Sequence, residues 1–374
     1  SYFTGRYGFT GGTLSTQYPV ISNIQVGVTG DYKVDGSWAS IPASPVVSVP
    51  STGVITPAPA QAFYTIPKYN PYPYVQSFNF TIQRELGDGW TADAGYVGSL
   101  GRQLEYNQEL NAAQPGTGTA GMPLNRLFGR TVSTVLRARG VNNNYNSLQS
   151  NLNKRFGSGL SLTAAYTYSK ALDVGSDQPS FTNNLDLHAN YGLASFDRTH
   201  MITLSHLYEL PFGPGKALLR DGALSYIARG WQLNGIFRAV SGTPLSITAD
   251  STSCACPGNG NYADATGKVS ILNGTGPGQY WFDRSAFAAP GANRFGTAGR
   301  NIVRGPGFAN YDLSVFRTFN VLEKARLEFR SEFYNLTHPP RGGNPNGSVN
   351  SGNFGQITST SGEREIQFAL RLLF

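Results

Sequence analysis

The sequence lacks any run of 18 or more apolar residues, so no segment of it can cross a bilayer as a helix. Charged residues are also few, at 14% of 374, while hydrophobic residues make up 40% and aromatic residues 12%. Glycine is abundant, at 45 residues, and Pro, Asn, Ser and Thr gather between the hydrophobic segments. This distribution is typical of short strands joined by polar loops. We therefore expect an all-β fold.

Histidine is scarce, which argues against a metal site or an enzyme. The four histidines, His188, His200, His206 and His338, are dispersed and form no His-Glu-x-x-His pattern. Residues 213–216 resemble a phosphate-binding loop only superficially, because the spacing and the following helix are missing. We predict no catalytic residues, no bound metal and no cofactor.

Cysteine is equally scarce, with one pair in a single segment, Cys254 and Cys256. A pair this close in an exported protein favours a disulfide that pins a loop tip. A metal site is the alternative, but it would need further ligands, and no other Cys and no His is nearby in the sequence.

The net charge is +7, yet Lys and Arg are scattered along the chain. Nucleic-acid binding is therefore not expected, because it needs a contiguous basic surface. The chain begins at Ser1 without a charged or apolar leader. A secretion signal would then have been removed or would lie upstream.

The clearest positive signal is period-2 alternation in the segment 363–374. Its apolar residues occupy every second position, whereas Glu365, Gln367 and Arg371 fall between them; the apolar set is Ile366, Phe368, Leu370, Leu372 and Phe374. Successive side chains of a strand point to opposite faces, so one face is apolar and the other polar. A strand of this kind that ends in an aromatic residue is what the barrel-assembly machinery reads in outer-membrane proteins, although Phe374 could also simply finish a core strand.

Eight further segments alternate in the same way, as four consecutive pairs: 77–86 with 90–96, 147–156 with 160–169, 200–210 with 231–240, and 311–319 with 325–333. Nine strands result, and a segment at 20–29 is a candidate tenth. Strands of roughly ten residues match the span of a tilted strand in hydrocarbon, whereas soluble sandwiches average about 5–6. Trp90 and Trp231 are expected in the aromatic girdles at the lipid interfaces.

The connections alternate between short and long. Links at 87–89, 157–159 and 320–323 are short, and 211–229 is intermediate; the long ones are 101–144, 173–198, 242–308 and 337–361. Outer-membrane barrels have short periplasmic turns and long extracellular loops. We predict an antiparallel transmembrane β-barrel in the outer membrane, with its C-terminus in the periplasm. A soluble sheet wet on one face is the alternative.

A charged ladder lies between the apolar residues of the segment 325–333. Arg326, Glu328, Arg330 and Glu332 should line the lumen, where charge can tune what passes or help hold an internal domain. A solvated inner wall with compensating charges explains them equally simply, and we prefer that interpretation.

Several segments, taken in order, resemble the Oar-like group of TonB-dependent receptors. They are PYVQSFN at 73–79, IQREL at 82–86, AGYVGS at 94–99, SFDRTH at 195–200, YELPFG at 208–213, GWQLNG at 230–235, SGTP at 241–244, RGPG at 304–307, FRSEFYNL at 329–336 and REIQF at 364–368. The resemblance covers about residues 72–374. It implies a carboxypeptidase-regulatory-like N-terminal domain, a plug and a 22-stranded barrel that takes up a substrate with energy from the TonB complex.

The chain departs from that pattern, because no TonB box, plug or N-terminal domain is recognisable. Nine or ten strands would leave two unpaired edges, which is costly in lipid. We therefore expect residues 1–374 to be the C-terminal part of one barrel domain, with 1–74 holding a strand and an external loop and 75–374 the remaining strands. The expected partners are outer-membrane lipid, the barrel-assembly machinery, TonB through a missing region, and proteins at the external loops. The alternative is a complete barrel of about 10–12 strands, acting as a passive pore or a surface adhesin.

Overall fold

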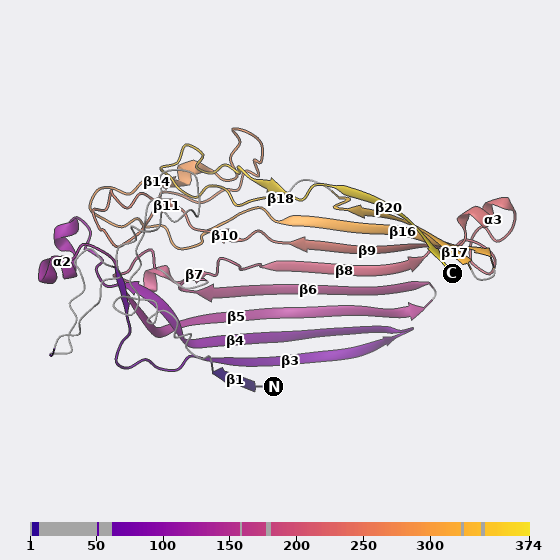
Figure 1. The fold of residues 1–374 in the computed structure, drawn as a ribbon, viewed down its shortest axis with the longest axis horizontal. Helices are drawn as coiled ribbons and strands as arrows, with labels where there is room; N and C mark the ends of the chain where they lie inside the picture. Colours follow the sequence, from indigo (N-terminus) through magenta and orange to yellow (C-terminus); the bar gives the residue numbers. More distant parts are fainter. Residues whose placement is uncertain are drawn as a thin grey trace, which may run out of the picture.

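The computed structural model describes residues 2–6, 51, 62–157, 159–176, 181–322, 325–337 and 341–374. Within them one large sheet dominates, and its order is β1-β3-β4-β5-β6-β8-β9-β16-β17-β20. Figure 1 shows these strands side by side, with long connections gathered at one end of the sheet and short ones at the other. We call these the loop end and the turn end.

The ten strands of this path follow one another as an antiparallel meander. They are β1 (Tyr2–Arg6), β3 (Tyr74–Gly87), β4 (Trp90–Glu109), β5 (Thr134–Gly157), β6 (Leu160–Asp173), β8 (His200–Glu209), β9 (Trp231–Val240), β16 (Phe308–Leu322), β17 (Ala325–Tyr334) and β20 (Glu365–Leu373). Two short strands join at the loop end, β2 (Phe63–Thr65) parallel to β5 and β7 (Gly192–Leu193) beside β6. We call the ten-strand sheet the wall.

All nine predicted strands are present, so the all-β, antiparallel prediction is confirmed. The tenth strand of the path is β1, which the sequence analysis missed, whereas the candidate strand at 20–29 lies outside the described residues. Among the described residues β1 pairs only with β3 and β20 only with β17, so the path ends on two open edges.

The pairing register aligns the alternating residues of neighbouring strands into two faces. On one face Phe80 pairs with Tyr96, which pairs with Leu148, which pairs with Tyr168. Farther along, Trp231 pairs with Arg317, Arg317 pairs with Phe329, and Phe329 pairs with Leu370. We call this the apolar face. The opposite, polar face includes Gln83, Asp93 and Asn151, which pair with one another in one continuous row.

The apolar face is not covered by other parts of the described chain. Phe368 is 71% exposed, Phe80 69% and Leu370 67%. Apolar side chains this large are normally buried in a water-soluble protein when they lie next to one another. The wall therefore presents a broad apolar surface to its surroundings.

Two wall strands are longer than predicted. The connection expected at 101–144 shrinks to the residues between Glu109 and Thr134, because β4 and β5 continue their pairing up to Glu109 and Val135. We call residues 104–109 with 134–141 the ribbon. Alternation continues along the ribbon: Glu105, Asn107, Arg137 and Arg139 share one face, and Leu104, Tyr106, Leu136 and Ala138 share the other.

A pair of compensating β-bulges separates the ribbon from the rest of the wall. β4 carries one extra residue between Gly101 and Leu104, and β5 carries one at Gly140. Arg102 fastens this point, since its Nη1 donates to the backbone oxygens of Gly101 (2.9 Å) and Asn143 (3.0 Å). The pairing then resumes in its original register.

Helices are few and short in the described part of the chain. α2 (Pro123–Phe128) lies at the loop end, and α3 (Ala223–Ala228) lies at the turn end (Figure 1). Three single 3-10 turns occur at Thr119–Gly121, His188–Asn190 and Arg284–Ala286. None of the described helices has the length and apolar character needed to span a membrane.

A packed cap as candidate functional site

The connections at the loop end fold into a compact body, which we call the cap (residues 242–307 and 341–361). Four two-stranded ladders build it: β10 (Pro244–Leu245) with β15 (Val303–Arg304), β11 (Thr248–Ala249) with β12 (Asn261–Tyr262), β13 (Asp264–Ala265) with β14 (Phe287–Ala288), and β18 (Arg341–Gly342) with β19 (Thr360–Ser361). The third and fourth long connections are thus folded together.

The cap has a hydrophobic core of its own, centred on Phe282. The Phe282 ring is fully buried and meets the rings of Phe287 (5.8 Å) and Phe354 (5.4 Å) edge to face. The rest of this core comprises Ile247, Tyr262, Ala263, Trp281, Ala286, Ala298 and Val303. This core was not predicted from the sequence. Three consecutive aromatic residues in a predicted loop, Tyr280 to Phe282, are the sequence feature that could have indicated it.

Two ion pairs join the cap to the wall. Arg300 contacts Asp173, the last residue of β6, and both side chains are about nine-tenths buried. Arg304 contacts Asp197, whose side chain is fully buried and also accepts from the Ala171 backbone N–H at 2.6 Å. Buried charges that are paired in this way are costly to separate. The cap is therefore fixed relative to β6.

Three of the segments that carried the family resemblance meet at this junction. Arg198, from 195–200, donates to the backbone oxygen of Ser241, from 241–244. Arg304, from 304–307, donates to the Gly242 oxygen at 3.1 Å. Gly242 lies so close to Gly305 that a Cβ would overlap the Gly305 carbonyl. Segments far apart in sequence thus form one joint between cap and wall.

The cysteine pair lies inside this packed region. Cys254 and Cys256 are joined as a disulfide, with a Cα–Cα distance of 5.3 Å, and both residues are fully buried. The backbone N–H of Gly116 donates to the Cys254 oxygen and that of Gly118 to the Ala255 oxygen, each at 2.8 Å. The segment packs against the connection between β4 and β5, so the disulfide lies in a loop that is buried among other loops.

Burial and hydrogen bonds shift several pKa values at the loop end. Burial raises the pKa of the Tyr262 hydroxyl. Burial, together with the nearby Arg238 and Arg304, lowers the pKa of Arg198. The hydrogen bond from Arg294 lowers the pKa of the Asp264 carboxyl. These pKa shifts arise from burial, hydrogen bonds and neighbouring charges at the loop end. Among the described residues, no group of three or more His, Cys, Asp or Glu could hold a metal ion.

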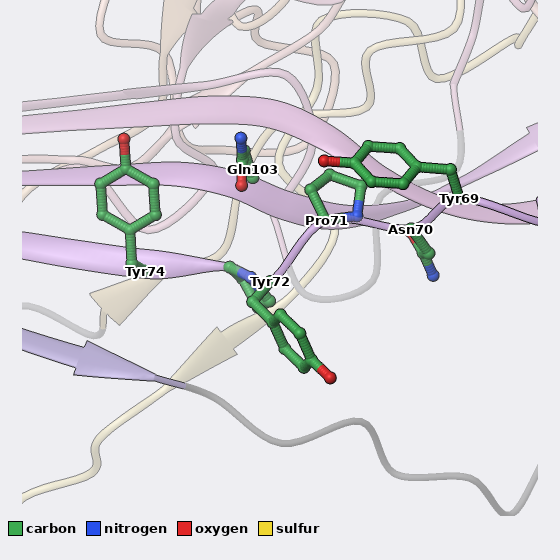
Figure 2. Close-up of a pocket in the computed structure, with 7 residues that line it drawn as sticks. Tyr69, Asn70, Pro71, Tyr72, Tyr74 and Gln103 are labelled. Carbon is green, nitrogen blue, oxygen red and sulfur yellow. The ribbon is translucent and has the colours of Figure 1, made fainter.

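Two open hollows lie beside the ribbon. The first, of about 570 Å³, is lined by Tyr69, Asn70, Pro71, Tyr72, Pro73, Tyr74 and Gln103. Figure 2 shows Tyr69 and Tyr74 on either side of Pro71, with the Tyr72 ring turned away from both. The second, of about 450 Å³, includes Arg102, Asn144 and Tyr191, and Asn144 Nδ2 donates to the Tyr191 hydroxyl at 2.7 Å.

The predicted charged ladder lies on the polar face of β17. Arg330 pairs with Glu328 at 3.0 Å and with Glu332 at 3.6 Å, while Glu328 faces Arg371 on β20 and Arg326 faces Asn320 on β16. The charges thus compensate one another along the strand. The predicted assembly-signal residues Ile366, Phe368, Leu370 and Leu372 share the apolar face, and Phe374 is 96% exposed.

A family model described as an outer membrane beta barrel domain matches residues 2–367. The chain belongs to this outer membrane β-barrel family. The wall is therefore a membrane wall and its apolar face is the lipid-facing one, as the alternating pattern predicted, so the soluble-sheet alternative is wrong. No curated protein matches the sequence.

Several solved structures are similar to the chain. The ferripyoverdine receptor of Pseudomonas aeruginosa is 11% identical, with a TM-score of 0.42 over 82% of this chain and 28% of the receptor. The siderophore receptor PiuA of Acinetobacter baumannii is 9% identical, with a TM-score of 0.40 over 81% and 28%. The FrpB iron transporter of Neisseria meningitidis is 11% identical, with a TM-score of 0.38 over 83% and 33%. The chain spans about a third or less of each of these proteins.

Proposed function

We propose that this chain forms part of the barrel wall of a TonB-dependent outer-membrane transporter. The observation that carries the proposal is the two-faced wall, which has a continuous lipid-facing side, a polar side and two open edges. The ordered motifs that resemble Oar-like receptors support it, because three of them converge on one joint between cap and wall. The substrate is not specified by these features.

The open edges require further strands. Each unpaired backbone group in hydrocarbon costs several kcal/mol, and one edge is the nine-residue strand β20. Additional strands of the same barrel would satisfy both edges, and a 22-stranded barrel with a plug would do so. In this arrangement the polar face, with Arg326 to Glu332, lines the lumen.

The proposal also gives the wall a direction. The loop end faces the outside of the cell and the turn end the periplasm, because long connections are extracellular in barrels of this kind. The C-terminus then lies in the periplasm, where the barrel-assembly machinery would meet the last strand. TonB would act from the same side through a region outside these residues.

The deciding experiment is the mass and domain content of the intact polypeptide extracted from outer membranes. A mass well above that of 374 residues, with a plug-like domain ahead of Ser1, is expected. Uptake by cells should also stop when TonB is deleted. An intact polypeptide without a plug would contradict the proposal.

A second candidate function is surface display, either adhesive or structural, and the folded cap favours it. The cap has its own core and is tied to the wall by buried ion pairs, as a rigid presenting surface would be. Such a protein would need no path through the barrel. Conductance through the purified protein in planar bilayers would count against this function, and unimpaired uptake after removal of the cap would do the same.

A further inference from the structure

The turn end contains a basic and apolar connection, residues 211–230, that the proposed function does not use. It holds Lys216, Arg220 and Arg229 against one carboxylate, Asp221. All three cations are exposed. The connection also exposes five large apolar side chains, namely Leu218, Leu219, Leu224, Tyr226 and Ile227, at 43 to 68%.

α3 is attached directly to the lipid-facing side of the wall. Arg317 occupies an apolar-face position between Trp231 and Phe329, where a cation would otherwise lie among rings. Its guanidinium turns to the end of α3 and donates to the oxygens of Tyr226 (2.6 Å) and Ile227. Trp231 Nε1 donates to the same Ile227 oxygen at 2.9 Å. A cation is favoured at a helix C-terminus, where carbonyls lack partners.

This attachment makes the exposed side chains of α3 continuous with the lipid-facing surface. Arg317 also lies 4.3 Å from the Phe319 ring and 5.8 Å from the Trp231 ring, at the level where an aromatic girdle meets the headgroups. Tyr226 and Ile227 join this belt through their backbone contacts with Arg317, and Figure 1 shows α3 projecting past the turn end of the sheet. A short segment that is apolar on one side and basic on the other lies in a membrane interface.

A hollow of about 530 Å³ adjoins α3 and has the composition of a headgroup site. Its lining includes the cations Lys216, Arg229 and Arg317 and the rings of Phe212 and Phe319. Glu209 pairs with Lys216 at 3.2 Å, and the pair is partly exposed. The exposed Arg229 forms no ion pair with a carboxylate of the described residues, and its guanidinium stacks on the Tyr226 ring at 4.5 Å. Cations beside rings at this level suit a phosphate above acyl chains.

We propose that residues 211–230 bind an anionic phospholipid of the adjacent leaflet, with α3 inserted at the interface and Lys216 and Arg229 at the headgroup phosphate. The proposal rests on the periplasmic orientation of the turn end given under the proposed function, because that leaflet supplies phospholipid. It does not depend on TonB or on transport. Failure of one is therefore distinguishable from failure of the other.

α2 provides a matched control, since it is also six residues long and exposes Leu127 to the same extent as α3 exposes Ile227, 68%. α2 lies beyond the ribbon, where Leu124 N–H donates to Asn111, and is not joined to the apolar face. The variants Ile227→Cys and Leu127→Cys of the full-length protein each add one free cysteine, which would be labelled with an environment-sensitive fluorophore. The native cysteines are bonded and buried, so they would not react.

The labelled proteins are placed in vesicles of phosphatidylethanolamine and phosphatidylglycerol that contain a headgroup-region lipid quencher, and in vesicles of phosphatidylcholine alone with the same quencher. The label at 227 should be quenched strongly in the anionic vesicles, and the label at 127 should not. Replacing Lys216 and Arg229 by Gln should weaken the preference for anionic vesicles about fivefold per cation, since each is worth about 1 kcal/mol at such a surface.

Equal quenching at 227 and 127 would overturn the proposal. An unchanged lipid preference in the K216Q/R229Q variant would also overturn it, provided that heat-modifiable mobility in gels shows that the barrel is folded. In the last experiment, inorganic phosphate is added to the labelled protein in lipid-free detergent, and the emission at 227 is measured. If phosphate alone changes the emission at 227 and lipid does not, the site binds free phosphate, and the lipid assignment is wrong.

Discussion

The wall and the cap achieve order by opposite means. The wall has regular pairing and leaves its largest rings exposed, as Phe368 at 71% illustrates, because lipid rather than protein covers them. The cap has only two-residue ladders, yet it buries Phe282 completely within an aromatic cluster. Hydrogen-bonded backbone defines the first region, and buried side chains define the second.

This difference predicts that the two regions can be damaged separately. A substitution in the cap core should open the cap while the wall survives, because few cap residues belong to the wall pairing. A substitution in the wall should alter strand packing without affecting the aromatic cluster. The four predictions below test this separation.

The largest effect is expected from Phe282→Ala in the cap. Loss of a fully buried ring that meets Phe287 and Phe354 should destabilise the cap by about 3–5 kcal/mol. Hydrogen exchange of cap amides should become faster, while exchange in β16 and β17 stays slow. Phe368→Ala on the lipid-facing side is the matched control, and equal exchange in both variants would remove the distinction between the regions.

A comparably large effect is expected at the junction from Asp197→Ala. It leaves Arg304 without its carboxylate and the Ala171 N–H without its acceptor, which should cost about 3–5 kcal/mol. Limited proteolysis should then cut between cap and wall. Arg294→Gln removes a more exposed pair with Asp264 and should leave the joint resistant to protease, because solvent screens an exposed ion pair. Resistance to protease in the Asp197 variant would show that the ion pair does not hold the joint.

A smaller effect is expected in the wall from Gly235→Ala. The added Cβ would lie 2.6 Å from His206 Nε2 and 2.8 Å from the Tyr311 ring, whose hydroxyl contacts that histidine at 2.8 Å across the glycine. Moving the ring should cost about 1–3 kcal/mol and lower the melting temperature of the wall in detergent. Gly352→Ala meets no atom within 4 Å and should leave it unchanged. Identical melting of both variants would refute the packing argument.

The smallest effect is expected from acid. The hydrogen bond from Arg294 lowers the pKa of Asp264, and the backbone N–H groups of Thr252 and Ser285 lower those of Asp250 and Asp283. A lowered carboxyl pKa contributes stability above the unfolded value, about 3.9, and that stability is lost as the pH falls through the folded value. Cap fluorescence from Trp281 should therefore change only below about pH 4. A transition near neutral pH would contradict this.

The sequence predicted the wall well, because lipid on one side and water on the other impose strict alternation. The ribbon escaped prediction because Gly, Arg and Gln at 101–103 and three Asn at 142–144 interrupt the alternation where the register of β4 and β5 shifts. β1 also escaped, because Tyr2–Arg6 is only five residues long. The cap could not be predicted from periodicity, since Phe282, Phe287 and Phe354 come from irregular segments that meet only in the folded chain.

The paired ribbon between Leu104 and Glu109 fixes the distance between the β-bulge and the connection that carries α2. A paired strand can be shortened or extended only by slipping its register, and a slip of one residue exchanges its two sides. Six residues at about 3.3 Å each raise the connection that carries α2 by about 20 Å. A force applied to this connection would therefore bend the ribbon at the bulge that Arg102 fastens, instead of shortening it.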